Sequence, residues 1–335
     1  MSRIAVLGSG AWGTAIALSL DRRGGHQVTL WSHSDDEAQS ILDARENTQF
    51  LPGFQLPSTL AVTSDAAGIR DAEVLVSVIP SEFLRPTWSR LTPHLHSGQI
   101  IVSATKGVED HTFFRMTQVI AAVLEPAGLS MPVGAFSGPT FALEVAQGQP
   151  TAVTVAYTDP SIATRVQQDF SSETLRLYTS TDVIGVELGG ALKNVIAISA
   201  GIVAGMGLGY NSAAGLMTRG IAEITRLAVA CGGRRETLAG LSGVGDLVLT
   251  CTGSLSRNRT VGQALGQGRK LPEILESLGG KVAEGVRTTR AALGLARQRG
   301  IEMPITEQME LILDAGKDPR EAIKDLMLRP GKDEE

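Results

Sequence analysis

Short runs rich in hydrophobic and β-branched residues recur through the first 180 residues, separated by longer stretches with hydrophobic residues at helical spacing. The short runs predict β-strands, and most of the stretches between them predict helices. Strands are expected at residues 3–7, 27–31, 60–63, 73–79, 99–104, 132–136, 151–156 and 175–179, and a helix at 13–23. This alternation is typical of an α/β protein with a doubly wound, mostly parallel sheet.

After about residue 181 the strand-like runs disappear. An all-helical C-terminal domain is predicted by the helical spacing of hydrophobic residues in 213–230, 285–299 and 304–314. The most apolar stretch, residues 195–208, is shorter than the ~20 residues needed to cross a bilayer, so we expect a buried helix there. A chain of 335 residues is long enough for two domains, which we place at residues 1–185 and 186–330.

Composition narrows the class of protein. The chain has 30 Lys and Arg against 35 Asp and Glu, a net charge of −5, which gives no general attraction to nucleic acid or anionic membranes. Its two cysteines lack disulfide-rich spacing, and glycines interrupt the apolar run near the N-terminus where a signal peptide would be continuous. We therefore expect a cytoplasmic protein that neither binds nucleic acid nor inserts into membranes. His94 and His96 have no further ligand at a recognisable spacing, so no metal site is expected.

Residues 8–13 carry the first chemical signal, the pattern G-x-G-x-x-G. The pattern follows the first predicted strand and opens a helix, which is the context of a Rossmann-type dinucleotide site. Gly8 permits the tight turn, Gly10 lets a pyrophosphate approach the backbone, and Gly13 lets the helix lie close to the strand. A purely structural glycine turn is the alternative.

The end of the second predicted strand bears on the choice of cofactor. NAD-specific sites usually have Asp or Glu there to bind the ribose hydroxyls. In this chain Trp31 is followed by Ser32 and His33. Without a carboxylate a 2′-phosphate is not repelled, and His33 could donate a hydrogen bond to it, so the cofactor is NADP or NAD. A solvated loop histidine is the alternative for His33.

Two lysines occupy unusual positions. Lys106 follows a predicted strand, and in open α/β sheets ligands collect at the carboxyl ends of strands. Lys193 lies in the strongly apolar segment 189–197, where a buried lysine needs a specific role. The alternatives are a solvated loop lysine for Lys106 and, for Lys193, a helix lysine whose ammonium reaches the solvent.

Polar residues in the second domain form two further groups. Asp246 and Thr250 are four residues apart, hence on one face of a helix, and an aspartate among apolar neighbours needs a cationic partner. A helix cap is the alternative for Asp246. Ser256, Arg257 and Asn258 lie beside an expected helix start and suit a phosphate monoester, with a surface salt-bridge cluster as the alternative.

Seven segments together resemble the bacterial-type NAD(P)-dependent glycerol-3-phosphate dehydrogenases. They are GSGAWGTA (8–15), ATKG (104–107), SGPTFA (137–142), LKNV (192–195), GVGDL (243–247), SRN (256–258) and EMPIT (302–306). They occur in the family's order and span nearly the whole chain. The resemblance implies a Rossmann domain, a helical substrate domain, and interconversion of dihydroxyacetone phosphate and sn-glycerol 3-phosphate, which supplies glycerophospholipid synthesis.

The resemblance also implies roles for individual residues. Lys193 corresponds to the proton donor and acceptor, with Lys106 and Asp246 beside it at the catalytic centre. The expected substrate contacts are Lys106, Gly138, Thr140, Lys193, Asp246, Ser256, Arg257 and Asn258, to which we add the neighbouring Asn194 and Thr250. The expected cofactor contacts are Gly8, Gly10, Ala11, Trp12, Gly13, His33, Lys106, Ala142, Arg257, Val282 and Glu284. Many relatives have Arg in place of Ser32, so the resemblance does not fix the preference between NADP and NAD.

Two other functions fit parts of the sequence. A reductase of a keto or hydroxy acid would need a cation for a carboxylate, and Arg257 could serve. A dinucleotide-sensing regulatory protein would need none of Lys106, Lys193 and Asp246, so their presence counts against it. The expected partner is a small phosphorylated three-carbon substrate, and a homodimer is left open.

Overall fold

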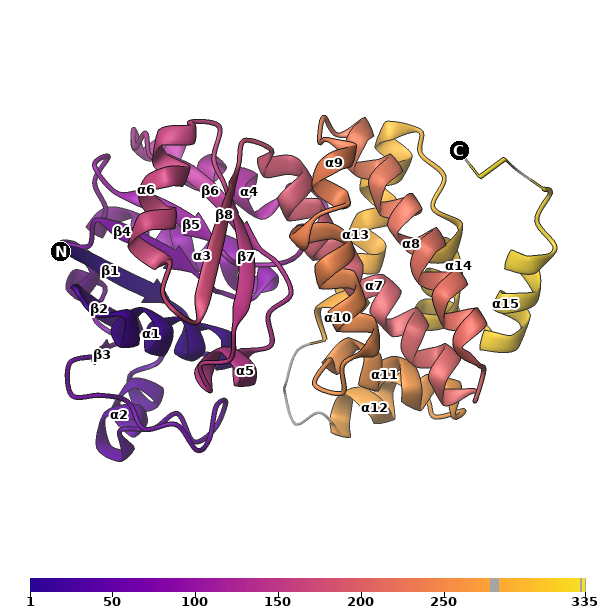
Figure 1. The fold of residues 1–335 in the computed structure, drawn as a ribbon, viewed down its shortest axis with the longest axis horizontal. Coiled ribbons are helices and arrows are strands. Elements are labelled where there is room, and N and C mark those ends of the chain that lie inside the picture. The colour runs from indigo at the N-terminus through magenta and orange to yellow at the C-terminus, as the bar shows by residue number, and fades with distance from the viewer. Residues whose placement is uncertain (278–282, 332, 335) are drawn as a thin grey trace.

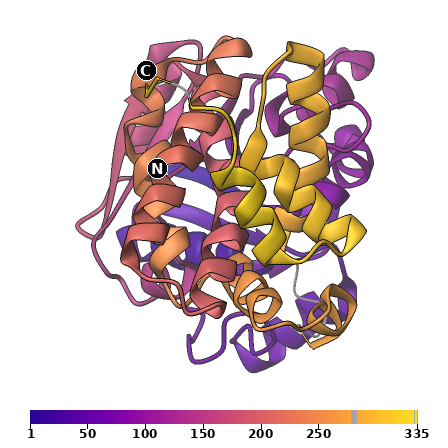
Figure 2. The same ribbon diagram turned by 90° about the vertical axis from the view of Figure 1, so that its right-hand side faces the viewer.

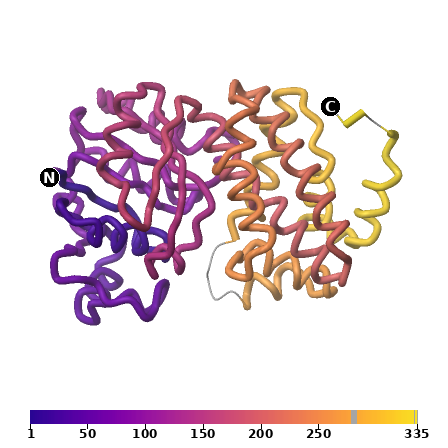
Figure 3. The backbone as a smooth tube through the Cα atoms, viewed as in Figure 1, coloured from indigo at the N-terminus to yellow at the C-terminus, as the bar shows by residue number. Residues whose placement is uncertain are grey.

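The computed structural model describes residues 1–277, 283–331 and 333–334. A sheet flanked by helices forms one side of the molecule, and a group of helices forms the other (Figure 1). The two chain ends lie at opposite ends of the long axis (Figure 3). The strands are β1 (Ser2–Leu7), β2 (His26–Trp31), β3 (Ala61–Thr63), β4 (Val74–Ser77), β5 (Ile100–Ser103), β6 (Val133–Ser137), β7 (Thr151–Ala156) and β8 (Leu175–Ser180).

These strands form one eight-stranded sheet in the order β3-β2-β1-β4-β5-β6-β7-β8. All neighbours are parallel except β6 and β7, which are antiparallel. The strand order reverses between β1 and β4, and ligands of open α/β sheets bind in the crevice at such a point. The expected doubly wound, mostly parallel sheet is confirmed, and all eight strands lie where the sequence predicted them, within a few residues at their ends.

Helices cover both faces of the sheet because alternate residues of its central strands are apolar on both sides. Ile4 and Val6 of β1 belong to one core, with α1, α2, α5 and α6. Ala5 and Leu7 belong to the other, with α3 and α4. These helices are α1 (Ala11–Arg23), α2 (Asp35–Ala44), α3 (Ser81–Leu91), α4 (Met116–Leu124), α5 (Ala142–Ala146) and α6 (Pro160–Phe170).

The helical region is built around α7 (Val183–Gly205), against which other helices pack (Figure 2). The remaining helices are α8 (Tyr210–Ala230), α9 (Arg235–Leu238), α10 (Asp246–Thr252), α11 (Arg257–Gly266), α12 (Leu271–Ser277), α13 (Glu284–Arg299), α14 (Pro304–Ala315) and α15 (Pro319–Met327). Glycines bring α7 and α11 close together. A Cβ on Gly201 would overlap the carbonyl oxygen of Arg259, and one on Gly262 would overlap that of Ile198. The expected all-helical C-terminal region is confirmed.

The central helix is longer than the sequence predicted. Hydrophobic residues indicated a helix from residue 195, but α7 begins twelve residues earlier, at Val183. Glycines and the buried Glu187 interrupt its apolar pattern. By length and composition α7 could cross a membrane, but 89 % of its most apolar window is buried inside the protein, as expected of a core helix. The domain boundary between residues 185 and 186 stays a prediction.

Candidate active site

The glycine-rich loop joins β1 to α1 at the point where the strand order reverses. Gly8 has φ +117°, and a Cβ there would lie 3.1 Å from the carbonyl oxygen of Val78, which follows β4. A Cβ on Gly13 would overlap the carbonyl oxygen of Gly8. Gly10 differs, because its φ is −65° and a Cβ would meet nothing within 4 Å. The protein itself therefore does not require glycine at position 10, and the open space at the start of α1 fits a bound pyrophosphate.

The side chains that border this loop are partly buried. Ala11 and Trp12 begin α1, Ala142 begins α5, and all three pack against the core on one face of the sheet. The ring of Trp12 lies 6.4 Å from that of Phe136. The helices α1 and α5 also pack against each other, so their first turns lie on the same face of the sheet.

Two charged side chains from other elements, Glu37 of α2 and Arg90 of α3, lie at the turn after β2. Ser32 is fully buried, whereas the side chain of His33 is 71 % exposed and its Nδ1 lies 3.7 Å from Oε2 of Glu37. The other oxygen of Glu37 accepts a hydrogen bond from Ser9 Oγ in the glycine-rich loop. From α3, Arg90 stacks over the ring of Trp31 at 5.0 Å and donates to the carbonyl oxygen of His33. Of the two polar residues that follow β2, the predicted cofactor contact His33 faces the solvent and Ser32 does not.

Three charged residues distant in sequence meet between the sheet and the helical region. Asp246, the first residue of α10, is fully buried and accepts hydrogen bonds from both lysines. Lys106 Nζ donates to Asp246 Oδ2 (2.7 Å) and to the carbonyl oxygen of Gly138 (3.4 Å). Lys193 Nζ donates to Asp246 Oδ1 and to Thr250 Oγ1 (2.6 Å). The cluster therefore carries one net positive charge, and neither lysine takes the solvated alternative.

Burial tunes the proton affinity of Lys193. Its pKa falls from 10.5 to about 8: loss of hydration is the largest cause, the nearby Lys106 charge also lowers the pKa, and the Asp246 carboxylate opposes both. The adjacent Cys251 is also buried, which raises the pKa of its thiol to about 12 and keeps it neutral. Lys193 is thus a buried amine that exchanges its proton near physiological pH.

Close packing of α7 on β6 brings Lys193 to this place. A Cβ on Gly190 would overlap Oγ of Ser137 at the end of β6. Gly138 follows Ser137 in the chain, and a Cβ on it would lie 2.9 Å from Cα of Val153 on β7. Thr140 follows in the same loop, and its Oγ1 donates to the carbonyl oxygen of Gly138 (3.2 Å). Glycine at 138 and 190 allows the helix, the loop and the sheet edge to approach.

The predicted phosphate-binding segment begins α11. Ser256 is its N-cap and accepts a hydrogen bond from Arg259 N (3.2 Å). Arg257 is exposed, and its guanidinium makes no hydrogen bond to any residue within the described ranges. Asn258 is buried and donates to Asn194 Oδ1 (3.0 Å), while its own Oδ1 accepts from the backbone N–H of residue 285 (2.9 Å). The two asparagines thus tie α7, α11 and α13 together beside the cluster, and Arg257 is left available for a ligand.

Glu284 connects the start of α13 to the sheet. Its Oε2 accepts a hydrogen bond from Ser81 Oγ (2.7 Å), at the start of α3 after β4. Burial raises the pKa of this carboxyl. A Cβ on Gly107, next to Lys106, would lie 3.8 Å from Glu284 Oε2. The predicted cofactor contact Val282 lies outside the described residues.

Comparison with known proteins identifies the family of the chain. The family described as NAD-dependent glycerol-3-phosphate dehydrogenase matches in both its parts, the N-terminus over residues 3–163 and the C-terminus over 182–324. The chain belongs to this family. The resemblance drawn from the sequence motifs is confirmed.

Individual relatives give the same result. The glycerol-3-phosphate dehydrogenase [NAD(P)+] of Acidobacterium capsulatum is 60 % identical and that of Koribacter versatilis 57 %, with 99 % or more of each chain covered. The crystal structure of glycerol-3-phosphate dehydrogenase from Coxiella burnetii has a TM-score of 0.92 and 38 % identity, covering 98 % of this chain and 99 % of that one.

Some residues of the site were missed from the sequence. Glu37, Arg90 and Ser81 contact predicted site residues from other helices. Nothing in the local sequence marks Arg90 or Ser81. An acidic first turn was the only signal for Glu37, and it is common to many helices. Among the described residues, no three His, Cys, Asp or Glu side chains lie close enough to hold a metal ion.

Proposed function

We propose that this protein interconverts dihydroxyacetone phosphate and sn-glycerol 3-phosphate by hydride transfer with NAD(P)H. The observation that carries the proposal is the buried Lys106–Asp246–Lys193 cluster at the carboxyl edge of a Rossmann-type sheet. Reduction of a ketone needs a proton for the developing alkoxide as well as a hydride. Lys193, with a pKa of about 8, is protonated at neutral pH and close to the ideal for donating and regaining a proton.

Asp246 and Lys106 hold this acid in place. Asp246 accepts from both ammonium groups, so each lysine is oriented by a common carboxylate. Its charge offsets the repulsion between them, while Thr250 accepts a second hydrogen bond from the Lys193 ammonium. Lys106, which is less buried than Lys193, donates to Asp246 and to the carbonyl oxygen of Gly138 and is left with one N–H group to bind the substrate oxygen. Proton transfer from such a positioned group contributes about 10²- to 10⁴-fold in rate.

The cofactor fits the other half of the site. NAD(P)H, when bound, supplies the hydride. Gly8, Gly10 and Gly13 would hold its pyrophosphate at the start of α1, with Ala11, Trp12 and Ala142 beside it. His33 would meet the ribose, Lys106 would contact the cofactor from the loop after β5, and Arg257 and Glu284 would contact it from the helical side. The predicted contact Val282 lies outside the described residues. The open space at Gly10 supports this assignment.

The substrate phosphate would be held at the start of α11. Arg257 offers a planar guanidinium that donates no hydrogen bond to a described residue, with the Glu284 carboxyl as a nearby opposite charge, next to the N–H groups of the helix that Ser256 caps. Gly138, Thr140, Asn194, Thr250 and Asn258 complete the proposed substrate site.

The wider role follows from the reaction. We assign residues 1–185 to the dinucleotide domain and 186–330 to the substrate domain. The product supplies glycerophospholipid synthesis, and the enzyme works in the cytoplasm on a small phosphorylated substrate, without nucleic acid or membrane insertion, as a monomer or a homodimer.

One assay tests the function. Purified protein is mixed with NADH or NADPH and dihydroxyacetone phosphate, and nicotinamide absorbance is followed. We expect NADH or NADPH to be oxidised only when dihydroxyacetone phosphate is present, and much more slowly when unphosphorylated dihydroxyacetone replaces it. Oxidation with a 2-keto acid but not with dihydroxyacetone phosphate would contradict the proposal in favour of a keto-acid reductase.

A further inference from the structure

The loop between β5 and α4 carries Lys106 and then enters the helical region. Val108, two residues after Lys106, is 4 % exposed and lies in the core formed mainly by α7, α8 and α13. An isolated β-bridge between Val108 and Arg115 closes the loop, and the backbone N–H of Glu109 donates to the carbonyl oxygen of Phe114 (2.9 Å). The backbone position of Lys106 is therefore coupled to the tip of this loop.

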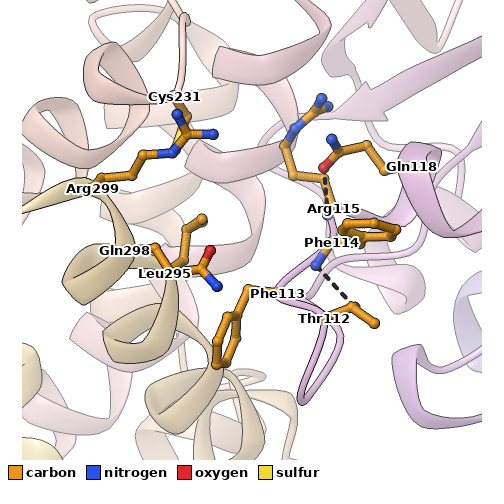
Figure 4. A pocket seen from close by; sticks show the side chains of 9 residues that line it. All are labelled: Thr112, Phe113, Phe114, Arg115, Gln118, Cys231, Leu295, Gln298 and Arg299. Carbon is orange, nitrogen blue, oxygen red and sulfur yellow. Dashed lines mark hydrogen bonds between the residues drawn. The ribbon is translucent and has the colours of Figure 1, made fainter.

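The tip has a backbone that its residues rarely adopt. His111 has φ +71° and Phe113 has φ +57°, in the left-handed region that favours glycine. Such strain persists only where surrounding contacts over-determine it. Phe113 supplies such a contact, because its ring packs on the bare backbone of α13 at Gly294, where a Cβ would overlap the ring. Figure 4 shows Phe113 directed from the loop toward the helix that carries Leu295, while Phe114 points the other way.

The opposite side of the loop is held by the sheet region. Arg85 of α3 donates two hydrogen bonds to the carboxylate of Glu109 (2.8 and 2.7 Å). Thr112 Oγ1 donates to the same carboxylate (2.6 Å). The loop is thus fixed between α3 on one side and α13 on the other.

We propose that Phe113, seated on Gly294, is a positioning residue that holds the loop so that Lys106 reaches Asp246. This inference rests on the proposed function, since it takes the Lys106–Asp246–Lys193 cluster as the site of proton transfer. Phe113 acts through the backbone of the loop that carries Lys106. Without its contact to Gly294, the strained tip relaxes and Lys106 withdraws from Asp246.

The charges around Lys193 give this movement a measurable signature. The charged side chains that face Lys193 are Asp246 and Lys106. Thr250 accepts a hydrogen bond from Lys193, and the neutral Cys251 lies beside it, with Arg259 near that thiol. Lys106 lowers the pKa of Lys193 and Asp246 raises it. If Lys106 withdraws, the pKa of Lys193 rises from about 8 because a like charge is removed and Asp246 serves one lysine instead of two.

The experiment uses Gly294→Ala, Phe113→Ala and the double variant of the full-length protein. Alanine favours the helical conformation of α13, so the added methyl acts through Phe113. A pocket of about 120 Å³ between the loop and α13, lined in part by Thr112, Cys231 and Arg299, gives the displaced ring room to move. Gly215→Ala is the matched control, because a Cβ at this α8 glycine meets nothing within 4 Å.

The pH dependence of kcat/KM for dihydroxyacetone phosphate is measured for each protein. We expect Gly294→Ala and Phe113→Ala each to lower kcat/KM roughly tenfold or more. In the wild type kcat/KM should decline at high pH as Lys193 loses its proton, and in both variants this decline, the alkaline limb, should move to a pH about half a unit higher. The double variant should lose no more than Phe113→Ala alone, since the methyl then has no ring to displace. Gly215→Ala should match the wild type in both respects.

Two results would overturn the positioning role. One is an alkaline limb that stays in place in both single variants, which would leave Phe113 with a purely structural effect. The other is a decrease in kcat/KM caused by Gly294→Ala that is equally large in the wild-type background and in the Phe113→Ala background. If Gly294→Ala fails to fold, the position of the alkaline limb in Phe113→Ala alone decides the test. Failure of the proposed function is distinguishable, because it would appear in the wild type as the absence of dihydroxyacetone phosphate reduction.

Discussion

The two halves of the site are built in different ways. The proposed pyrophosphate site of the cofactor half is local in sequence, because one strand, three glycines and the start of one helix provide it between residues 2 and 23. The proposed catalytic half is assembled from Lys106, Lys193 and Asp246, of which the first and last are 140 residues apart. The local half is defined by backbone shape, whereas the assembled half depends on how α7 and α10 pack against the sheet. The two halves should therefore respond differently to mutation.

Lys193→Ala should separate the halves most sharply. Removing the ammonium eliminates the proposed proton donor but leaves the glycine-rich loop untouched. We expect turnover to fall at least ~10²-fold while NAD(P)H affinity stays unchanged. Steady-state kinetics at saturating substrate and fluorescence titration of the cofactor measure the two quantities. Near-normal turnover in this variant would show that Lys193 is not the proton donor.

Arg257→Ala tests the proposed phosphate contact. Loss of a charge-assisted contact to a bound phosphate costs about 2–5 kcal/mol. We therefore expect kcat/KM to fall much more for dihydroxyacetone phosphate than for unphosphorylated dihydroxyacetone, measured at saturating cofactor because Arg257 is also a proposed cofactor contact. Arg257→Lys should restore little, since the ammonium lacks the planar fork. Equal losses with both substrates would move the phosphate site to Arg259 or Lys106.

Two glycine variants probe the cofactor half alone. Gly10→Ala adds a methyl to space that no described residue occupies, so thermal stability should change little. NAD(P)H affinity should fall about tenfold, equivalent to ~1.4 kcal/mol, because the methyl would take the place of the pyrophosphate. Gly13→Ala is the contrasting control, since its Cβ overlaps the Gly8 carbonyl oxygen and should lower thermal stability. Unchanged cofactor affinity in Gly10→Ala would place the pyrophosphate elsewhere.

His33→Glu addresses cofactor preference, with the smallest expected effect. The structure favours His33 over Ser32 for this test because Ser32 is buried and an aspartate there would disturb the turn. Two unit charges about 4 Å apart in water repel by ~1 kcal/mol, roughly a fivefold effect. The ratio of kcat/KM for NADPH to that for NADH should fall by about this factor. A constant ratio would show that this turn does not meet the 2′ position.

The same contrast between local and assembled features explains what the sequence could predict. The strands and the glycine-rich loop were predictable because periodicity and G-x-G-x-x-G are local patterns. The apolar surroundings of Lys193 correctly indicated burial, but residue spacing alone could not pair it with Asp246, which folding brings to it from 53 residues away. The start of α7 was missed because its first residues pack glycines and Glu187 rather than a continuous apolar face. Phe113 gave no signal, since its contact with Gly294 arises only in the folded protein.

The central claim is that Lys193 donates the proton during reduction and accepts it during oxidation. Its most direct test is the pH dependence of kcat/KM in both directions with the wild-type protein, which reports the free enzyme. With a pKa of about 8, the protonated fraction falls as the pH rises, so reduction should decline above about pH 8 and oxidation should decline below it. The two limbs should share one pKa and slope in opposite directions. Limbs that slope the same way, or the absence of any limb between about pH 7 and 9, would contradict the account.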